Sequence, residues 1–293
     1  MNASMHKPQF RLRTLLMLMI LATTGMGWIA VRLHKAQRQE LAVAALRRAG
    51  GQVLYFQDQT DQSGNEFVGE ESPRGVWLQA MVGRARVFQV DFSDAIGGVT
   101  DLELQPVKEL ADLQHLFLSG MPITGSGLRH IQGLNDLEVL YLDQTQVTDR
   151  ALEHLCNLPR LRFVDLGATR ITGAGFRHFQ GLPNLQDLAL EETDVTDDAL
   201  PYLKALPQLR HLNLKNTRIS DAGLRYLKDL PTLRTLGLNG TRITDAGLEH
   251  LAALPELTAV EVADTRVTAE GVKRLKRASP QCEIYCGFFV PDD

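Results

Sequence analysis

The sequence predicts an α/β protein: a right-handed, horseshoe-shaped solenoid of about eight repeated units, preceded by an N-terminal transmembrane helix. Three observations support this prediction. Leu-Pro pairs recur at a constant spacing of 24 residues, beginning at Leu158, Leu182, Leu206, Leu230 and Leu254. Within each unit the spacing of apolar residues changes from two, typical of a strand, to three, typical of a helical turn. Residues 14–31 form an uninterrupted run of 18 uncharged residues.

The composition excludes several classes of protein. The chain has 293 residues, of which 44% are hydrophobic, 23% are charged and three are cysteines. These values exclude a disordered chain, a collagen, a polytopic membrane protein and a disulfide scaffold. Residues 1–48 carry eight Lys/Arg and one Glu, whereas the rest carries 23 basic and 34 acidic residues. An acidic body argues against a nucleic-acid partner, because phosphates attract clustered Lys and Arg.

The N-terminal segment has the pattern of a membrane anchor. Residues 1–13 are a basic tail, and residues 14–31 would span roughly 27 Å as a helix, just enough for a bilayer core. Trp28 suits the interface at its end. We expect a retained single-pass anchor with the repeat domain on the non-cytoplasmic side. A cleaved signal peptide is the alternative, because small residues follow the apolar run at 22–25.

Residues 32–86 are expected to form a linker and an N-terminal cap, because the first unit of a stacked solenoid must be covered. The expected order is a helix, a strand, a polar loop and a second short helix, at residues 36–49, 52–57, 57–75 and 76–83. Gly50 and Gly51 mark the end of the first helix. The C-terminal cap is expected at residues 278–293, with a strand over 282–290.

Residues 87–277 are expected to fold as the repeats. The unit starting at Leu209 reads LRHLNLKNTRISDAGLRYLKDLPT. Its first part alternates like a strand, with Asn213 pointing outward between two leucines. Its second part places leucines three apart, behind Asp221, which we expect to cap the turn. Strands stack about 4.8 Å apart and helices about 10 Å apart, so the stack should curve with the sheet on its concave side.

This unit resembles the 24-residue repeats of bacterial leucine-rich repeat proteins, some of which carry an N-terminal membrane anchor. The resemblance covers residues 87–277 and implies a binding protein with no catalytic activity and no cofactor. The family usually has Asn at a corner position that is Thr here, at Thr145, Thr169, Thr193, Thr217, Thr241 and Thr265. A Thr hydroxyl at that corner is able to bond the backbone of the next unit.

The concave face is the candidate binding surface, because its side chains have no role in the core. Aromatic and apolar residues gather on the first regular strands, and acidic residues follow them, a pattern that suits a protein or peptide partner with apolar and basic groups. The candidate ligand-binding residues are His115, Phe117, Val139, Tyr141, Phe163, Asp165, Asp187 and Glu191. The alternative is that the N-terminal cap or linker covers this patch.

Motifs for catalysis and metal binding are missing or weak. The sequence has no phosphate-binding glycine loop, no HExxH and no nucleophile elbow. Four histidines share a helical-side column, at His130, His154, His178 and His250, but units there lie too far apart to converge on a metal. Cys282 and Cys286 could form a disulfide if their segment turns. Two rival functions stay open: a self-assembling architectural surface protein, and an enzyme with its site in residues 50–86.

Overall fold

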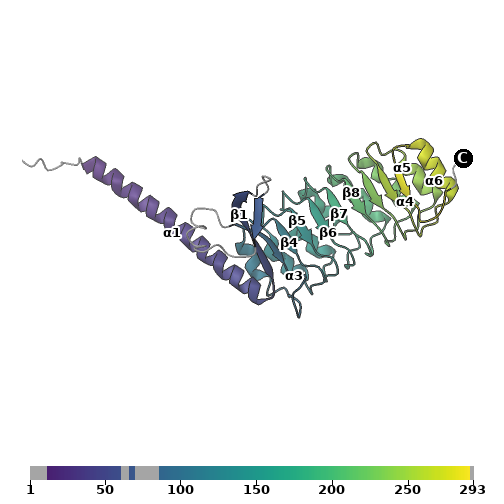
Figure 1. Ribbon diagram of the computed structural model, residues 1–293. Helices are drawn as coiled ribbons and strands as arrows, with labels where there is room; N and C mark the ends of the chain where they lie inside the picture. Colours follow the sequence, from purple (N-terminus) through teal and green to yellow (C-terminus); the bar gives the residue numbers. More distant parts are fainter. Residues whose placement is uncertain (1–11, 61–65, 70–85, 291–293) are drawn as a thin grey trace, which may run out of the picture.

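The computed structural model describes residues 12–60, 66–69 and 86–290; the side chains of residues 12–25, 56–60 and 66–69 are likewise outside the description. A long helix leads into an elongated solenoid, and the C-terminus lies at the far end (Figure 1). The short helix predicted at 76–83 lies outside the described residues.

Helix α1 runs without a break over Leu12–Arg48. Its last turns pack into the solenoid through Ala42, Val43 and Leu46, against β1 and against the 3₁₀ helix η1 (Gln105–Glu109). The helix stops where Gly50 adopts a left-handed backbone, φ 93°. The predicted membrane span at 14–31 is part of α1, but among the described residues no helix combines the length and apolarity that crossing a bilayer requires.

One sheet of 11 strands runs the length of the solenoid, in the order β11-β10-β9-β8-β7-β6-β5-β4-β3-β1-β2. Strands β3 to β11 are parallel and occupy Arg86–Asp91, His115–Phe117, Val139–Tyr141, Phe163–Asp165, Asp187–Ala189, His211–Asn213, Thr235–Gly237, Ala259–Glu261 and Glu283–Tyr285. From β4 on, each residue pairs with the one 24 positions later, so equivalent side chains of successive units form columns.

The N-terminal cap extends the sheet with antiparallel strands. β1 (Gln52–Thr60) pairs with β3 on one side and with β2 (Glu66–Gly69) on the other. The loop predicted over 57–75 is therefore wrong in part, because residues 57–60 and 66–69 belong to two antiparallel strands whose backbone groups pair with each other. At the other end β11 is shorter than the strand predicted over 282–290, since the backbone of Gly287 turns at φ 72°.

Short helical turns cover one face of the sheet. Beyond η1 they are α3 (Gly125–Leu128), η2 (Arg129–Ile131), η3 (Asp149–His154), η4 (Phe176–Gly181), η5 (Asp197–Ala205), α4 (Asp221–Leu224), η6 (Leu227–Asp229), α5 (Asp245–Leu251) and α6 (Ala269–Ala278). Most are 3₁₀ or a single α turn, as leucines three residues apart favour. The final helix, α6, is the longest of these turns and exposes Arg274 and Lys276 while burying Leu275.

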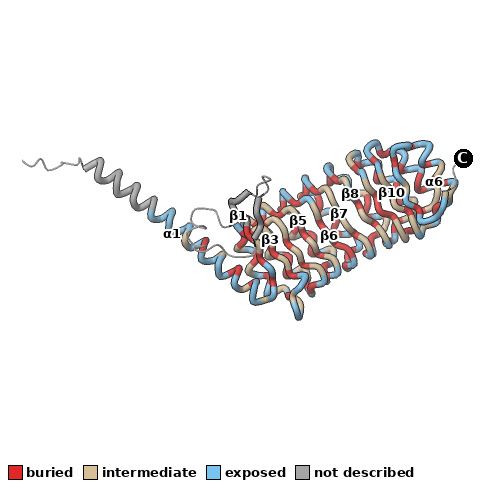
Figure 2. The backbone as a smooth tube through the Cα atoms, viewed as in Figure 1, coloured by how far each residue is buried: buried red, intermediate tan, exposed pale blue. Residues whose placement is uncertain are grey.

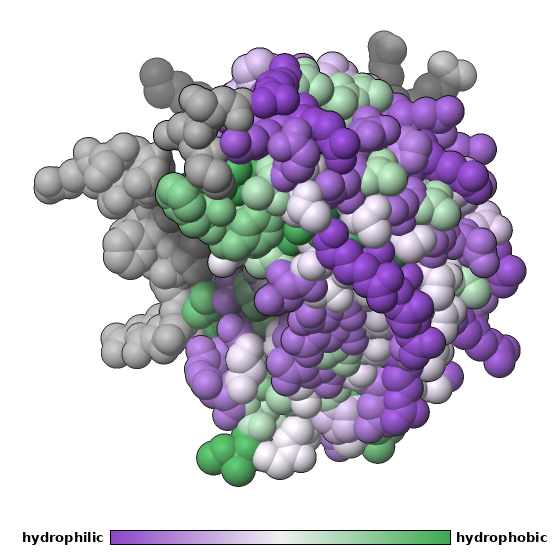
Figure 3. Space-filling model, turned by 90° about the vertical axis from the view of Figure 1, so that its right-hand side faces the viewer, coloured by the Kyte–Doolittle hydropathy of each residue, from purple (hydrophilic) through white to green (hydrophobic). Residues whose placement is uncertain are grey.

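The core is a continuous layer of leucines between the sheet and these turns, visible as the buried residues along the tube in Figure 2. In β8 the alternation is as predicted: Leu212 and Leu214 are buried and Asn213 between them is half-buried. Seen from the C-terminal end, the surface is mostly hydrophilic with smaller apolar areas (Figure 3). A polar end is what a terminal solenoid unit needs.

Two predicted corner contacts are wrong. The buried Thr hydroxyls donate within their own unit, for example Thr217 Oγ1 to the Leu214 carbonyl at 2.6 Å, because the side chain folds back over the strand end. Asp221 is not the cap of its own turn: its carboxylate accepts from the amide and hydroxyl of Thr244 in the next unit, at 2.7 and 2.6 Å. Ser220 occupies the cap position instead.

Candidate ligand-binding face

The sheet face, by which we mean the side of β3–β11 opposite the helical turns, carries the candidate residues. In each three-residue strand from β4 to β10 the middle side chain is buried in the core, so the first and third project onto the sheet face. The parallel register then sets these side chains beside their equivalents in the neighbouring units, about 4.8 Å away.

Three aromatic rings from successive strands form a stack on this face. Phe117 and Tyr141 have ring centroids 4.9 Å apart and are nearly parallel, at 14°. Tyr141 and Phe163 follow at 4.7 Å and 37°. All three rings are half-buried. We call Phe117, Tyr141 and Phe163 the aromatic stack; because it offers rigid apolar area at little conformational cost, it is suited to binding.

His115 and Val139 lie beside the aromatic stack. The His115 ring contacts Phe117 at 6.4 Å and Phe88, on β3, at 4.3 Å between centroids. Burial lowers the pKa of His115, although the nearby Glu138 carboxylate opposes that shift. Phe88 was missed in the sequence because two residues, not one, separate the buried Val87 and Val90, so strict alternation does not place it.

The described part of the N-terminal cap leaves the aromatic stack uncovered. Strands β1 and β2 continue the sheet beyond β3, and α1 packs against η1 on the helical side. The alternative in which the cap covers the patch is therefore not supported for these elements. The remainder of the linker, residues 61–65 and 70–85, lies outside the described residues.

Carboxylates follow the aromatic stack. Burial, together with the nearby carboxylates of Glu191 and Asp143, raises the pKa of Asp165 to about 6, against the opposing effect of a 2.9 Å hydrogen bond from the Gly167 amide. Burial also raises the pKa of Asp187, although His211, whose Nε2 lies 3.8 Å from Asp187 Oδ1, opposes the shift. Positive charge from His211 and Arg210 therefore compensates Asp187 in part, whereas the groups that shift the pKa of Asp165 include no cation.

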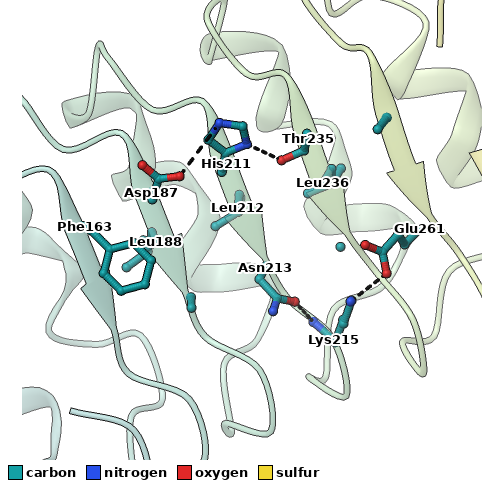
Figure 4. A pocket seen from close by; sticks show the side chains of 13 residues that line it. Phe163, Asp187, Leu188, His211, Leu212, Asn213, Lys215, Thr235, Leu236 and Glu261 are labelled. Carbon is teal, nitrogen blue, oxygen red and sulfur yellow. Dashed lines mark hydrogen bonds and ion pairs between the residues drawn. The ribbon is translucent and has the colours of Figure 1, made fainter. Parts of the chain in front are cut away.

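A hollow of about 320 Å³ lies next to these residues on β6–β10 (Figure 4). It exists because small residues occupy the projecting positions at Ala189, Gly237 and Ala259. Polar side chains line its sides: His211 Nδ1 lies 2.5 Å from Thr235 Oγ1, and Lys215 Nζ lies 2.6 Å from Glu261 Oε2. The hollow thus combines apolar floor and polar walls, as ligand pockets do.

The structure divides the predicted site residues between two neighbouring areas. Phe163 and Asp187 line the hollow, and Glu191 borders it by accepting a 3.0 Å hydrogen bond from Asn213. The other five lie on the aromatic stack or beside it, at His115, Phe117, Val139, Tyr141 and Asp165. The sequence interpretation missed the hollow's polar walls, His211, Asn213, Lys215, Thr235 and Glu261. Small residues in the same columns were the signal that could have found it.

Metal and disulfide chemistry receives no support from the geometry. Within the described part of the chain, no group of three His, Cys, Asp or Glu side chains is arranged to hold a metal ion. His154 is engaged with Gln132, at 2.8 Å between Nδ1 and Nε2. Cys282 and Cys286 flank β11 and are both buried. They are free thiols, because the extended strand between them keeps the two sulfur atoms apart.

Comparison with known proteins decides the class of fold. Residues 207–252 match the family described as leucine rich repeats, in two copies. This chain folds as a leucine-rich repeat solenoid. The chain is similar in fold to internalin C2 from Listeria monocytogenes, with 24% identity and a TM-score of 0.55 over 71% of this chain and 80% of that one. No curated protein matches it.

Proposed function

We propose that this leucine-rich repeat protein binds a protein or peptide partner through its sheet face. The observation that carries the proposal is the aromatic stack. Its three rings are half-buried on the sheet face, at strand positions where the fold does not need an aromatic residue. Buried aromatic anchors supply most of the energy in protein interfaces. The neighbouring hollow would receive a side chain of the partner.

The test is selection of peptides from a random displayed library on the full chain, followed by measurement of their affinity for variants. Tyr141→Ala combined with Phe163→Ala should weaken the selected peptides by about 2–4 kcal/mol, because both anchors are truncated. Thermal unfolding should change little. Tyr202→Ala is the matched control, since this exposed tyrosine lies on η5, away from the sheet face. Undiminished binding by the double variant would place the site elsewhere.

Self-assembly is the second candidate function. Measuring the mass of the particle at several protein concentrations distinguishes it from binding to another protein. A self-assembling chain would increase in mass with concentration in light scattering, and the same double variant would stay monomeric only if the sheet face formed the contact. An enzyme site in residues 50–86 remains the least supported alternative. Turnover of model esters or peptides by the purified chain would favour it.

The membrane attachment stays a prediction based on the uncharged run at residues 14–31 and the basic residues on both sides of it. If it is correct, alkaline carbonate should leave the full chain in the membrane pellet. Protease added to intact cells should then degrade the repeat domain if that domain lies on the non-cytoplasmic side. Release into the supernatant by carbonate would exclude the anchor.

A further inference from the structure

Four side-chain positions of β6 and β7 enclose a small cell on the sheet face. The register pairs Phe163 with Asp187 at the first position of each strand, and Asp165 with Ala189 at the third. Each pair is separated by about 4.8 Å and the two pairs by about 7 Å along the strands. Phe163 and Asp187 stand at the edge of the hollow (Figure 4). Asp165 and the small Ala189 complete the cell through the register, and the short Ala189 side chain leaves space beside Asp165.

Among the described residues, Asp165 of this cell has no positive partner comparable to that of Glu261, whereas Asp187 has His211 Nε2 at 3.8 Å from its Oδ1. Glu261, on the far side of the hollow, receives Lys215 Nζ at 2.6 Å and Asn239 Nδ2 at 2.9 Å. Asp165 accepts only the backbone amide of Gly167 among its hydrogen bonds in the described part of the chain. Both Asp165 Oδ1 and the Glu191 side chain lie against Gly167, so a second carboxylate adds negative charge beside it.

We infer that this cell binds an arginine side chain of the partner, with the guanidinium stacked on Phe163 and donating hydrogen bonds to Asp165 and Asp187. This inference rests on the proposed function and names the chemistry of the partner: an extended peptide segment that carries an arginine beside apolar residues. The apolar residues would lie on Tyr141 and Phe117, the part of the aromatic stack one and two strands away from the cell.

Arginine fits the cell better than lysine or a metal ion. A planar guanidinium stacks on an aromatic ring and has five N–H donors, so it reaches two acceptors on opposite sides. The compact ammonium group of lysine cannot both stack on the Phe163 ring and reach the two carboxylates. A metal ion needs more ligands than two carboxylates supply, and among the described residues no group of three His, Cys, Asp or Glu side chains could hold one.

Burial of the cell's carboxyls adds a second argument. The raised pKa of Asp165 and of Asp187 reports carboxylates that water solvates incompletely. A guanidinium that replaces the missing solvation forms charge-assisted hydrogen bonds, which are stronger than neutral ones. The free protein thus already holds these carboxyls in positions where a bound cation would be stabilised.

The test compares arginine with citrulline, its neutral isostere, in peptides selected on the full chain. We expect selected peptides to contain arginine, and replacement of that arginine by citrulline to weaken binding by about tenfold or more. Asp165→Asn and Asp187→Asn should each erase most of the difference between the two peptides. Asp198→Asn, at an exposed carboxyl of η5, is the matched control.

A steric variant tests the cell without changing its charge. Ala189→Leu should fill the space beside Asp165 and weaken the arginine peptide by about tenfold while leaving thermal unfolding unchanged, whereas Ala252→Leu, at an exposed position behind α5, should leave binding intact. If citrulline binds as well as arginine while Tyr141→Ala with Phe163→Ala still abolishes binding, the arginine cell is wrong and the proposed function stands. If no selected peptide depends on either set of residues, both are wrong.

Discussion

At the residue scale, each corner after a strand requires a left-handed backbone at one position. Seven residues spaced 24 apart have φ between 49° and 70°, at Gly120, Gln144, Ala168, Glu192, Asn216, Gly240 and Asp264. The turned backbone aims the N–H of that residue at the next unit, as when Ala168 donates to the Glu191 carbonyl at 2.8 Å. Only two of the seven are glycine, so the other corners carry a backbone cost in return for the bond between units.

This cost is measurable at two exposed corners. Ala168→Gly should stabilise the fold by about 1 kcal/mol, because glycine adopts a positive φ without steric conflict. Gly120→Ala should destabilise it by a similar amount, and no heavy atom lies within 4 Å of the added Cβ, so the change isolates the backbone. Urea unfolding of both variants gives the two values. Equal stability of all three proteins would show that these corners are unstrained.

At the element scale, aspartates join the helical turns of successive units. Asp149, at the start of η3, accepts hydrogen bonds from the Thr172 amide and hydroxyl and from the amides of Gly173 and Gly175 in the next unit, at 2.7 to 3.1 Å. Asp221 and Thr244 repeat the arrangement further along. The turns have little regular helix of their own, so these bonds replace part of the missing backbone pairing.

Asp149→Ala should therefore cost about 2–3 kcal/mol, since several amides of the next unit lose their acceptor at once. Asp198→Ala, which removes an exposed carboxyl from η5, should stay within about 0.5 kcal/mol of the unaltered chain. Chemical unfolding followed by circular dichroism checks both. A loss as small as that of the control would mean that water satisfies the Gly173 and Gly175 amides without Asp149.

The same elements show how far the sequence predicted the structure. The strands and the core were predicted correctly from the leucine spacing. The leucines recur every 24 residues, and each occupies the same buried position in its unit as its equivalents do in the others. The hydrogen-bond partners of polar side chains were not predictable in this way. Thr217 and Asp221 each have several donors or acceptors within reach, and the path of the backbone at the corner determines which partner each one bonds. The hairpin of β1 and β2 lies outside the repeat, so no periodicity marked it.

The candidate face was predictable in part for a related reason. The contact of Phe117 with Tyr141 could be read from the register, because large residues at equivalent positions must meet. Phe163 pairs with Val139 in the register and meets Tyr141 only diagonally, so its place in the stack depends on side-chain direction. The hollow, by contrast, is formed by small residues and by side chains that pair across more than one strand. An example is the ion pair between Lys215, which follows β8, and Glu261 on β10. These contacts depend on side-chain direction, which the repeat pattern does not specify.

At the scale of the whole molecule, the proposed site and the stability of the fold should oppose each other at Asp165. Its raised pKa, about 6 against an ordinary 3.8, means that the folded chain holds the proton more tightly than the unfolded chain. The stabilising contribution of the protonated carboxyl is therefore complete below about pH 4 and is lost as the pH rises to about 6. Above that pH the ionised Asp165, facing Glu191 and Asp143, weakens the solenoid.

Asp165→Asn should accordingly stabilise the chain at pH 7.5 by about 1 kcal/mol, a value that allows for screening of this partly exposed carboxyl by water. The gain should vanish at pH 4, where both side chains are neutral, and urea unfolding at the two pH values measures it. The same variant should bind the arginine peptide more weakly, and the unaltered chain should bind it more tightly at pH 7.5 than at pH 5. A carboxylate that destabilises the free protein yet strengthens binding is the signature of a site kept for its partner; a destabilised Asp165→Asn variant at pH 7.5 would mean that the carboxylate serves the fold instead.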